Sequence, residues 1–267
     1  MNGGAIEIGI WKLIFMYALL IPSLAIIVRY KLGLTKRVVI AILRMTGQLL
    51  LVGIFLKYIF LFNNFLLNTA WLMVMLLAAN LSVTSNAGLR KKYFFLPVLA
   101  GIAISTITVA SFLIVLVVRP EPFYDARYFI PLTGMILGNS MRGNVLVLER
   151  FYTKMEESRK LYSSYLLMGA TRNEAMKPFM AEALRASLIP TVTVIATVGI
   201  VSLPGVMTGQ ILGGSMPMTA IKYQIAIMIA IFITMTFTGY LNLKLTTLTT
   251  FDKFDNLKPD VLKEPDK

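Results

Sequence analysis

Residues 94–118 read FFLPVLAGIAISTITVASFLIVLVV and contain no charged side chain. An α-helix rises about 1.5 Å per residue, so about 20 apolar residues cross the roughly 30 Å hydrocarbon core of a bilayer. The segment is therefore predicted to be a transmembrane helix. Comparable apolar stretches lie on both sides of it, and together they predict seven spans, at about 10–28, 38–60, 65–84, 94–118, 128–148, 178–202 and 219–243.

The composition agrees with a membrane protein. The chain is 57% hydrophobic and 15% charged, whereas charged residues make up about a quarter of a soluble domain. We expect an all-α integral membrane protein with one transmembrane domain over residues 1–250 and a polar cytoplasmic tail over 251–267. Cysteine and histidine are both absent, which excludes disulfides, thiol chemistry and metal sites built on thiolate or imidazole ligands.

The net charge of +13 is compatible with a nucleic-acid partner or with the enrichment of lysine and arginine in cytoplasmic loops. The basic residues concentrate in alternate connections, at 28–37, 88–93 and 149–177, and in the tail. The intervening connections hold few of them. This alternation predicts an N-terminus outside and a C-terminus in the cytoplasm, and it argues against nucleic acid.

The segment 149–177 is longer than a simple connection between two spans requires. Within it, residues 148–170 are predicted to form a helix that projects into the cytoplasm. An apolar stripe runs along that helix, formed by Phe151, Met155, Tyr162, Tyr165 and Leu166. An exposed apolar stripe favours contact with a partner, so we expect a docking element here.

A turn follows this helix, in the stretch SSYLLMGATRNEAMKPFM at 163–180. Gly169 is a suitable C-terminal stop because glycine adopts the left-handed conformation without a Cβ penalty. Thr171 and Glu174 have the spacing of a capping box, which starts a new helix. The chain is thus predicted to form a cytoplasmic helical hairpin between the fifth and sixth spans.

Polar residues inside spans are costly and mark candidate positions for a transport pathway. Gly/Pro-rich segment 202–219 is the other candidate, because two prolines and several glycines disfavour a continuous helix and suggest a broken or re-entrant outer gate. The pathway or gate candidates are Arg44, Gln48, Asn139, Arg142, Arg185, Pro204, Gly205, Gly209 and Gln210.

Each of these candidates has a structural alternative. Arg44 and Arg142 could extend toward the membrane interface, and Arg185 could pair with Glu182, three residues earlier. The glycines of 202–219 could serve close helix packing, as could GMILGNS at 134–140, where a second copy of the chain is one neighbour to consider.

Several motifs carry a resemblance to a known family. They are IPLTGMILGNSM at 130–141, MGAT at 168–171, EALRASLIPTV at 182–192, TVGIVSLPGVMTGQILGG at 197–214 and AIKYQI at 220–225. With these motifs the chain resembles the FetB family of ABC-transporter permeases over most of its length. Bacterial members of that family are associated with iron export. Plant members, linked to aluminium tolerance, are associated with nucleotide-sugar transport.

The resemblance implies a non-enzymatic permease subunit in a bacterial inner or plasma membrane, paired with a second copy of itself and with a separate ATPase that binds ATP and magnesium. No G-x-x-x-x-G-K-[ST] phosphate loop occurs in the chain, which agrees with a separate motor. In this interpretation YLLMGATRNEA at 165–175 docks on the ATPase. The residues implied in coupling are Tyr165, Leu166, Gly169, Ala170, Thr171 and Glu174. The chain departs from the EAA loop of ABC importers, because Ile189-Pro190 comes later than that pattern expects.

The substrate is less well defined by the residues. A bare iron ion favours carboxylate or carbonyl oxygens, and the predicted spans contain almost no carboxylate, so the iron assignment follows from the resemblance alone. The arginines favour an anion, such as a nucleotide sugar. A stand-alone secondary transporter or channel is a different class of function, but it would require carboxylates at the midplane. A membrane scaffold that recruits a cytosolic protein is a further alternative.

Overall fold

The computed structural model describes residues 6–262, in which the regular secondary structure is helical, with isolated β-bridges in the connections. Ten α-helices and one π-helix, η1, follow one another along it. Their bounds are α1 Ile10–Ala18, α2 Leu20–Arg29, α3 Thr35–Phe62, α4 Phe65–Asn86, α5 Lys91–Phe112, η1 Leu113–Val118, α6 Ala126–Glu157, α7 Arg159–Leu167, α8 Arg172–Thr197, α9 Gly205–Leu212 and α10 Pro217–Thr250.

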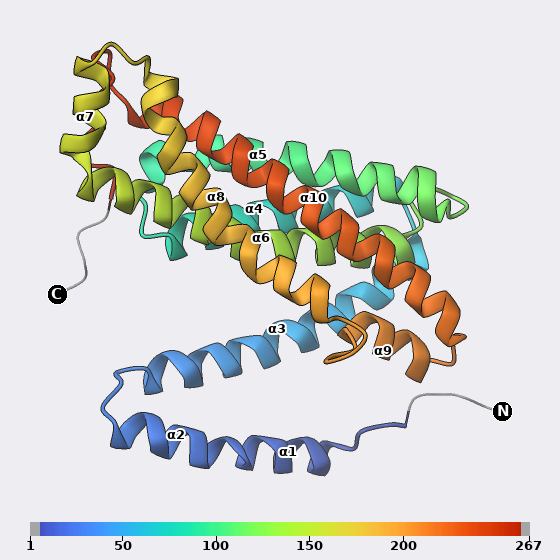
Figure 1. The fold of residues 1–267 in the computed structure, drawn as a ribbon. Coiled ribbons are helices and arrows are strands. Elements are labelled where there is room, and N and C mark those ends of the chain that lie inside the picture. The colour runs from blue at the N-terminus through green and yellow to red at the C-terminus, as the bar shows by residue number, and fades with distance from the viewer. Residues whose placement is uncertain (1–5, 263–267) are drawn as a thin grey trace.

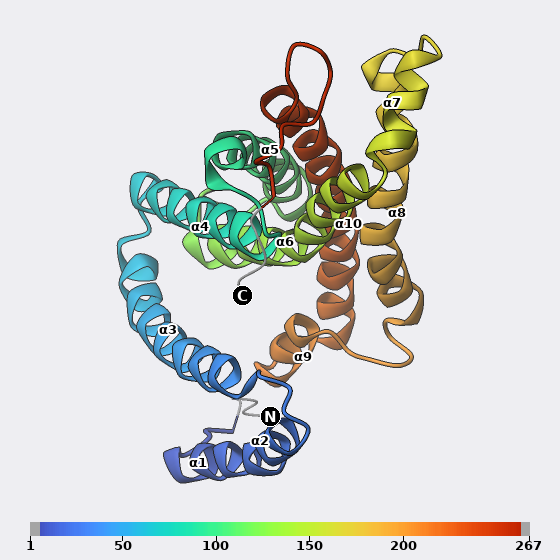
Figure 2. The ribbon, with the colours of Figure 1, turned by 90° about the vertical axis from the view of Figure 1, so that its left-hand side faces the viewer.

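Helices α4, α5, α6, α8 and α10 form the main bundle, with α6 crossing its interior (Figures 1 and 2). Close backbone approach holds α5 against α10, because a Cβ on Gly101 would overlap Asn242 Oδ1 and lie 3.3 Å from Asn242 N. The Asn242 amide in turn donates from Nδ2 to Asn144 Oδ1 on α6, at 3.0 Å. Both asparagines are fully buried, so a polar contact in the core fixes the positions of three helices.

Helices α1 to α3 form an arm beside the bundle (Figures 1 and 2). In these three helices Ile59 is the one buried residue among those described. It packs against Ala126 and Ile130 of α6, and Asn63 Oδ1 accepts a hydrogen bond from Ala126 N at 2.9 Å. The arm is therefore attached to the bundle at the C-terminal end of α3. The rest of its apolar surface is available to lipid or to another protein.

Six predicted spans coincide with helices that are long and apolar enough to cross a membrane, namely Ile10–Arg29, Thr35–Phe62, Phe65–Asn86, Lys91–Val118, Arg172–Thr197 and Pro217–Thr250. The predicted span 128–148 lies within α6, which is not among these six. Asn139, Arg142 and Asn144 make this helix more polar than the others. Neighbouring helices surround much of α6, so it does not need an apolar surface on every side.

The connections predicted to be cytoplasmic meet at one end of the bundle. Arg90 N, in the α4–α5 loop, donates to Val261 O at 3.2 Å, and Tyr162 of α7 donates from its hydroxyl to Asp255 O at 2.8 Å. The turn between α2 and α3 lies toward the same side of Figure 1, whereas α9 lies toward the opposite side. Loops predicted to face opposite sides thus lie toward opposite ends of the molecule, and the side of the membrane that each end faces stays a prediction.

Candidate functional site

The helical hairpin has the turn that the sequence predicts. Gly169 has φ +90°, in the left-handed region that glycine adopts easily. Thr171 N donates to Glu174 Oε2 at 2.8 Å, and Glu174 N donates to Thr171 Oγ1 at 3.4 Å. The capping box that starts α8 is thereby confirmed. The single projecting helix expected over 148–170 is instead divided at Ser158 into the end of α6 and the short helix α7.

Most of the apolar stripe of the hairpin is covered by the chain itself. Phe151, Met155 and Tyr162 are buried in the same cluster as three residues that follow α10, Phe251, Leu257 and Val261. The expectation that these stripe residues face a partner is therefore wrong. The segment 251–262 folds back on the hairpin, a contact between positions about 90 residues apart that no local pattern reveals.

Polar contacts reinforce this packing. Arg172 lies in the first turn of α8, and its Nη1 is 3.4 Å from Asp255 Oδ1. Its guanidinium carbon is 5.9 Å from the centroid of the Phe251 ring. The Tyr162 ring packs edge-on against Phe251 with centroids 5.9 Å apart. Burial raises the pKa of Tyr162 to about 12, so its hydroxyl stays protonated, and able to donate, further into the alkaline range than that of a free tyrosine.

The tip of the hairpin exposes a different pair of apolar residues. Leu167 is 88% exposed and Met168 is 74% exposed. Both lie within the segment 165–175 that is expected to dock on the ATPase, but they are not among the residues singled out there, because they lie off the apolar stripe. Of the residues implied in coupling, Gly169, Thr171 and Glu174 are exposed beside this pair, whereas Tyr165, Leu166 and Ala170 are half-buried.

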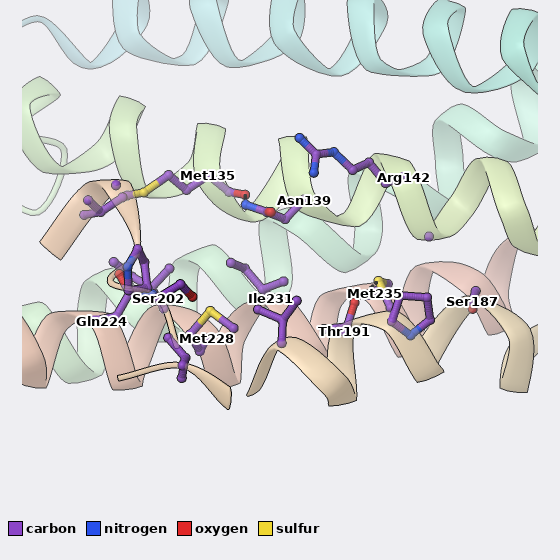
Figure 3. Close-up of a pocket in the computed structure, with 18 of the residues that line it drawn as sticks. Met135, Asn139, Arg142, Ser187, Thr191, Ser202, Gln224, Met228, Ile231 and Met235 are labelled. Carbon is purple, nitrogen blue, oxygen red and sulfur yellow. Dashed lines mark hydrogen bonds between the residues drawn. The ribbon is translucent and has the colours of Figure 1, made fainter. Parts of the chain in front are cut away.

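A cavity of about 450 Å³ lies between α6, α8, α9 and α10 (Figure 3). Its polar lining residues come from three helices and the α8–α9 connection, and its sulfur-bearing ones from α6 and α10. The polar residues are Asn139, Arg142, Ser187, Thr191, Ser202 and Gln224. The methionines are Met135, Met228 and Met235. A volume of this size is within the range of small-molecule sites.

Three of the six polar side chains in the cavity wall have a hydrogen-bond partner in the described chain. Asn139 donates from Nδ2 to Met135 O at 2.8 Å, and Ser187 donates to Leu184 O at 2.9 Å. Thr191 Oγ1 lies 3.4 Å from Met235 Sδ. Gln224 is different, because it is 7% exposed and its Oε1 is buried without a hydrogen-bond partner in the described chain. Its Oε1 is therefore a buried polar atom without a hydrogen bond at the edge of the cavity.

The structure separates the predicted pathway residues into three groups. Asn139, Arg142, Pro204 and Gly205 line the cavity. Gly209 and Gln210 lie on α9 outside its lining, although Gln210 Oε1 is buried and has no partner among residues 6–262. The remaining candidates are exposed on α3 or α8 away from the cavity, and they are Arg44, Gln48 and Arg185.

The Gly/Pro-rich segment is discontinuous, as predicted. Helix α8 ends at Thr197, a turn follows, and α9 is a short helix that begins after Pro204. A Cβ on Gly205 or Gly209 would meet no atom within 4 Å, so within the described chain no helix packs against them. A Cβ on Gly134 would lie 3.0 Å from Met75 Cε. This supports the alternative in which the small residue at this position permits close helix packing.

The polar lining residues that lie outside the segments and positions predicted from the sequence are Ser187, Thr191 and Gln224. Isolated serines and threonines are common in membrane helices, so they carry no distinctive signal. Gln224 does carry one, because it is an uncharged amide in the apolar run of the last span. In residues 6–262 no three Asp or Glu side chains lie close enough together to hold a metal ion. The cavity lining contains no carboxylate at all.

The helices long and apolar enough to cross a membrane define a multi-span membrane protein with a cavity between four of its helices. Residues 10–251 match uncharacterised protein family UPF0014, and the chain belongs to this family.

Three relatives illustrate its range. The chain is 35% identical over 227 residues to a UPF0014 membrane protein of Synechocystis sp., covering 83% of this chain and 86% of that protein. It is 34% identical over 212 residues to the probable iron export permease protein FetB of Escherichia coli, covering 79% and 80%. It is 30% identical over 230 residues to the protein ALUMINUM SENSITIVE 3 of Arabidopsis thaliana, covering 82% of each. No solved structure matches the chain.

Proposed function

We propose that the chain is the membrane-spanning subunit of an ATP-driven ABC exporter that moves iron, free or chelated, out of the cytoplasm. Two copies would surround the pathway, and a separate ATPase would bind ATP and magnesium. The hairpin and the C-terminal segment would face the cytoplasm, and the N-terminus would lie outside. The similarity to the probable iron export permease of Escherichia coli supports this choice of substrate and direction.

The exposed tip of the hairpin carries the proposal. Leu167 and Met168 are among the most exposed large apolar residues of the chain. They stand at the cytoplasmic end in the proposed orientation, where lipid does not cover them, and such a pair favours a protein partner. Because α8 begins directly after the tip and lines the cavity at Ser187 and Thr191, movement of the partner would reach the pathway through one helix.

The test uses the full chain, purified together with a candidate ABC ATPase from the same organism and reconstituted in liposomes. The variant Leu167→Ser/Met168→Ser removes the exposed apolar pair, and we expect it to abolish stimulation of ATP turnover. Phe254→Ser is the matched control, because Phe254 is 82% exposed at the same end of the molecule but outside the hairpin. Normal stimulation in the tip variant, or a similar loss in the control, would contradict the docking role.

A second candidate function is export of a nucleotide sugar or another anion. Arg142 favours it, because it is the one charged residue in the cavity lining. The same liposomes distinguish the substrates. ATP turnover is measured in the presence of chelated iron, of ferrous iron alone and of UDP-glucose, each added both inside and outside the liposomes, and the three rates are compared.

A further inference from the structure

A groove separate from the cavity lies between α8 and α10, at the end of the bundle that carries the hairpin. It has a volume of about 410 Å³, and the two helices run side by side along it (Figures 1 and 2). At one end Lys244 donates from Nζ to Asn173 Oδ1 at 3.2 Å. At the other end a Cβ on Gly239 would lie 3.1 Å from Leu184 Cδ2, so the helices approach closely there. The groove is therefore bounded at both ends by contacts between its two walls.

The polar end of the groove brings two lysines together. Lys177 is four residues after Asn173 and so lies on the same face of α8, about 6 Å further along the helix axis. Because the Lys244 ammonium is bonded to Asn173, both lysines line the same part of the groove. An ammonium has three donors, and Lys244 uses one of them on Asn173. In residues 6–262 no ion pair involves Lys177 or Lys244.

Glu174 is the one carboxylate in the groove lining, and it is already engaged elsewhere. Its Oε2 accepts hydrogen bonds from Thr171 N at 2.8 Å and from Thr171 Oγ1 at 2.6 Å. The capping box thus holds this carboxylate at the start of α8, on the side of the hairpin turn. Two ammonium groups against one carboxylate leave the groove with a net positive charge, which an anion complements through charge-assisted hydrogen bonds.

The other end of the groove is apolar. Met180 is buried, Leu184 is half-buried, and Ala181 and Tyr240 are exposed along the walls. This apolar end lies further from the ends of α8 and α10 than the lysines do, since Lys244 is in the last two turns of α10. In a bilayer the lysines would therefore lie near the headgroups and the apolar end in the hydrocarbon region. Tyrosine is enriched near that boundary.

We infer that this groove binds an anionic phospholipid from the leaflet on the side of the hairpin. Lys177 and Lys244 hold the phosphate of the headgroup, and one acyl chain lies along Met180, Leu184 and Tyr240. Basic pockets between transmembrane helices suit such headgroups. The inference is independent of the exporter proposal, because it requires only that α8 and α10 cross a membrane, and both are long and apolar enough to do so.

Native mass spectrometry of the purified full-length chain in mild detergent tests the inference, because it resolves the binding of single lipid molecules. Phosphatidylglycerol is anionic and phosphatidylcholine is zwitterionic, so the two lipids with identical acyl chains isolate the effect of charge. We expect phosphatidylglycerol to bind more tightly. Lys177→Gln and Lys244→Gln should each weaken its binding by about fivefold, and neither should change the binding of phosphatidylcholine. Inorganic phosphate at millimolar concentration should not displace the lipid, because it cannot use the apolar end.

Two further variants separate the groove from the surface around it. Lys91→Gln/Lys92→Gln is the matched control for Lys177→Gln/Lys244→Gln, since it removes two exposed lysines from the start of α5, at the same end of the molecule. We expect this control to bind phosphatidylglycerol like the wild type. Ala181→Phe fills the apolar end without changing any charge and should weaken binding of the lipid. A thermal unfolding curve without added lipid checks that each variant is folded.

The opposite results overturn the inference. Equal affinity for the two lipids, or equal losses in the two double-lysine variants, would mean that charge attracts lipid to this end of the molecule without a site in the groove. Displacement by inorganic phosphate would make free phosphate the ligand. Unchanged binding in Ala181→Phe would show that no acyl chain occupies the groove.

Discussion

Replacing Gly101 with alanine is expected to force α5 and α10 apart. The new Cβ would overlap Asn242 Oδ1 and lie 3.3 Å from the Asn242 backbone nitrogen. The Asn242 side chain is fully buried and donates to Asn144 Oδ1 at 3.0 Å. Rotating the amide away from the added methyl group would break that bond, so the helix itself must shift or the hydrogen bond must be lost.

Two costs determine the magnitude. Overpacking a core costs about 1–3 kcal/mol. Loss of a hydrogen bond between membrane helices costs about 0.6 kcal/mol on average and up to about 1.7 kcal/mol. Alanine regains about 0.5–1 kcal/mol over glycine inside a helix. The net loss of unfolding free energy is therefore about 1–3 kcal/mol for Gly101→Ala.

Reversible unfolding in mixed micelles, titrated with SDS and followed by circular dichroism, measures this loss. Gly138→Ala in α6 is the control, because a Cβ at that position would meet no atom within 4 Å. We expect the control to be as stable as the wild type or slightly more stable. If the two alanine variants unfold at the same SDS fraction, the close approach of α5 and α10 does not hold the bundle as argued.

Two further predictions concern the hairpin. The pKa of Tyr162 is raised from 10.0 to about 12 in the folded chain, so its contribution to stability is complete below pH 10 and is lost as the pH rises toward 12. Limited proteolysis should show the hairpin and the 251–262 segment opening over that range, and Tyr162→Phe should reduce the pH dependence; an unchanged profile in the variant would exclude this tyrosine as the cause. Thr171→Ala should destabilise the start of α8 by about 1 kcal/mol, because it removes the N-cap. Hydrogen exchange at residues 172–175 measures the effect, and unaltered protection there would show that tertiary packing alone holds the first turn.

The parts of the hairpin that the sequence predicts correctly are local. The stop at Gly169 and the capping box of Thr171 and Glu174 depend on residues within five positions of one another, so the pattern alone specifies the turn. The covering of the apolar stripe depends on Phe251 and Leu257, which are about 90 residues away in the chain. A periodic pattern shows that a face is apolar but does not show what covers it.

The cavity shows the same limit. Arg142 and Asn139 could be identified as candidates because polar residues are unusual within an apolar span. Arg44 has the same local signature, yet it lies on the arm and not at the cavity. The packing of α3 against α6 through Ile59 decides that difference, and no feature near Arg44 encodes it. Gln224 carries a local signal as well, as an amide in the apolar last span, but only the packing of α10 against α6 and α8 shows that it lines the cavity.

Helix α8 joins the hairpin tip to the cavity as one piece. It begins at Arg172, beside the turn, and reaches the cavity lining at Thr191, a distance of about 30 Å at about 1.5 Å per residue. The ion pair of Arg172 with Asp255 braces its near end. Pro178 lies near the tip and Pro190 at the cavity, and each removes a backbone hydrogen bond inside α8. In mechanical terms α8 is a lever with two joints, so under the proposed function a tilt applied at the tip would be shared between bending at Pro178 and bending beside the cavity wall at Pro190.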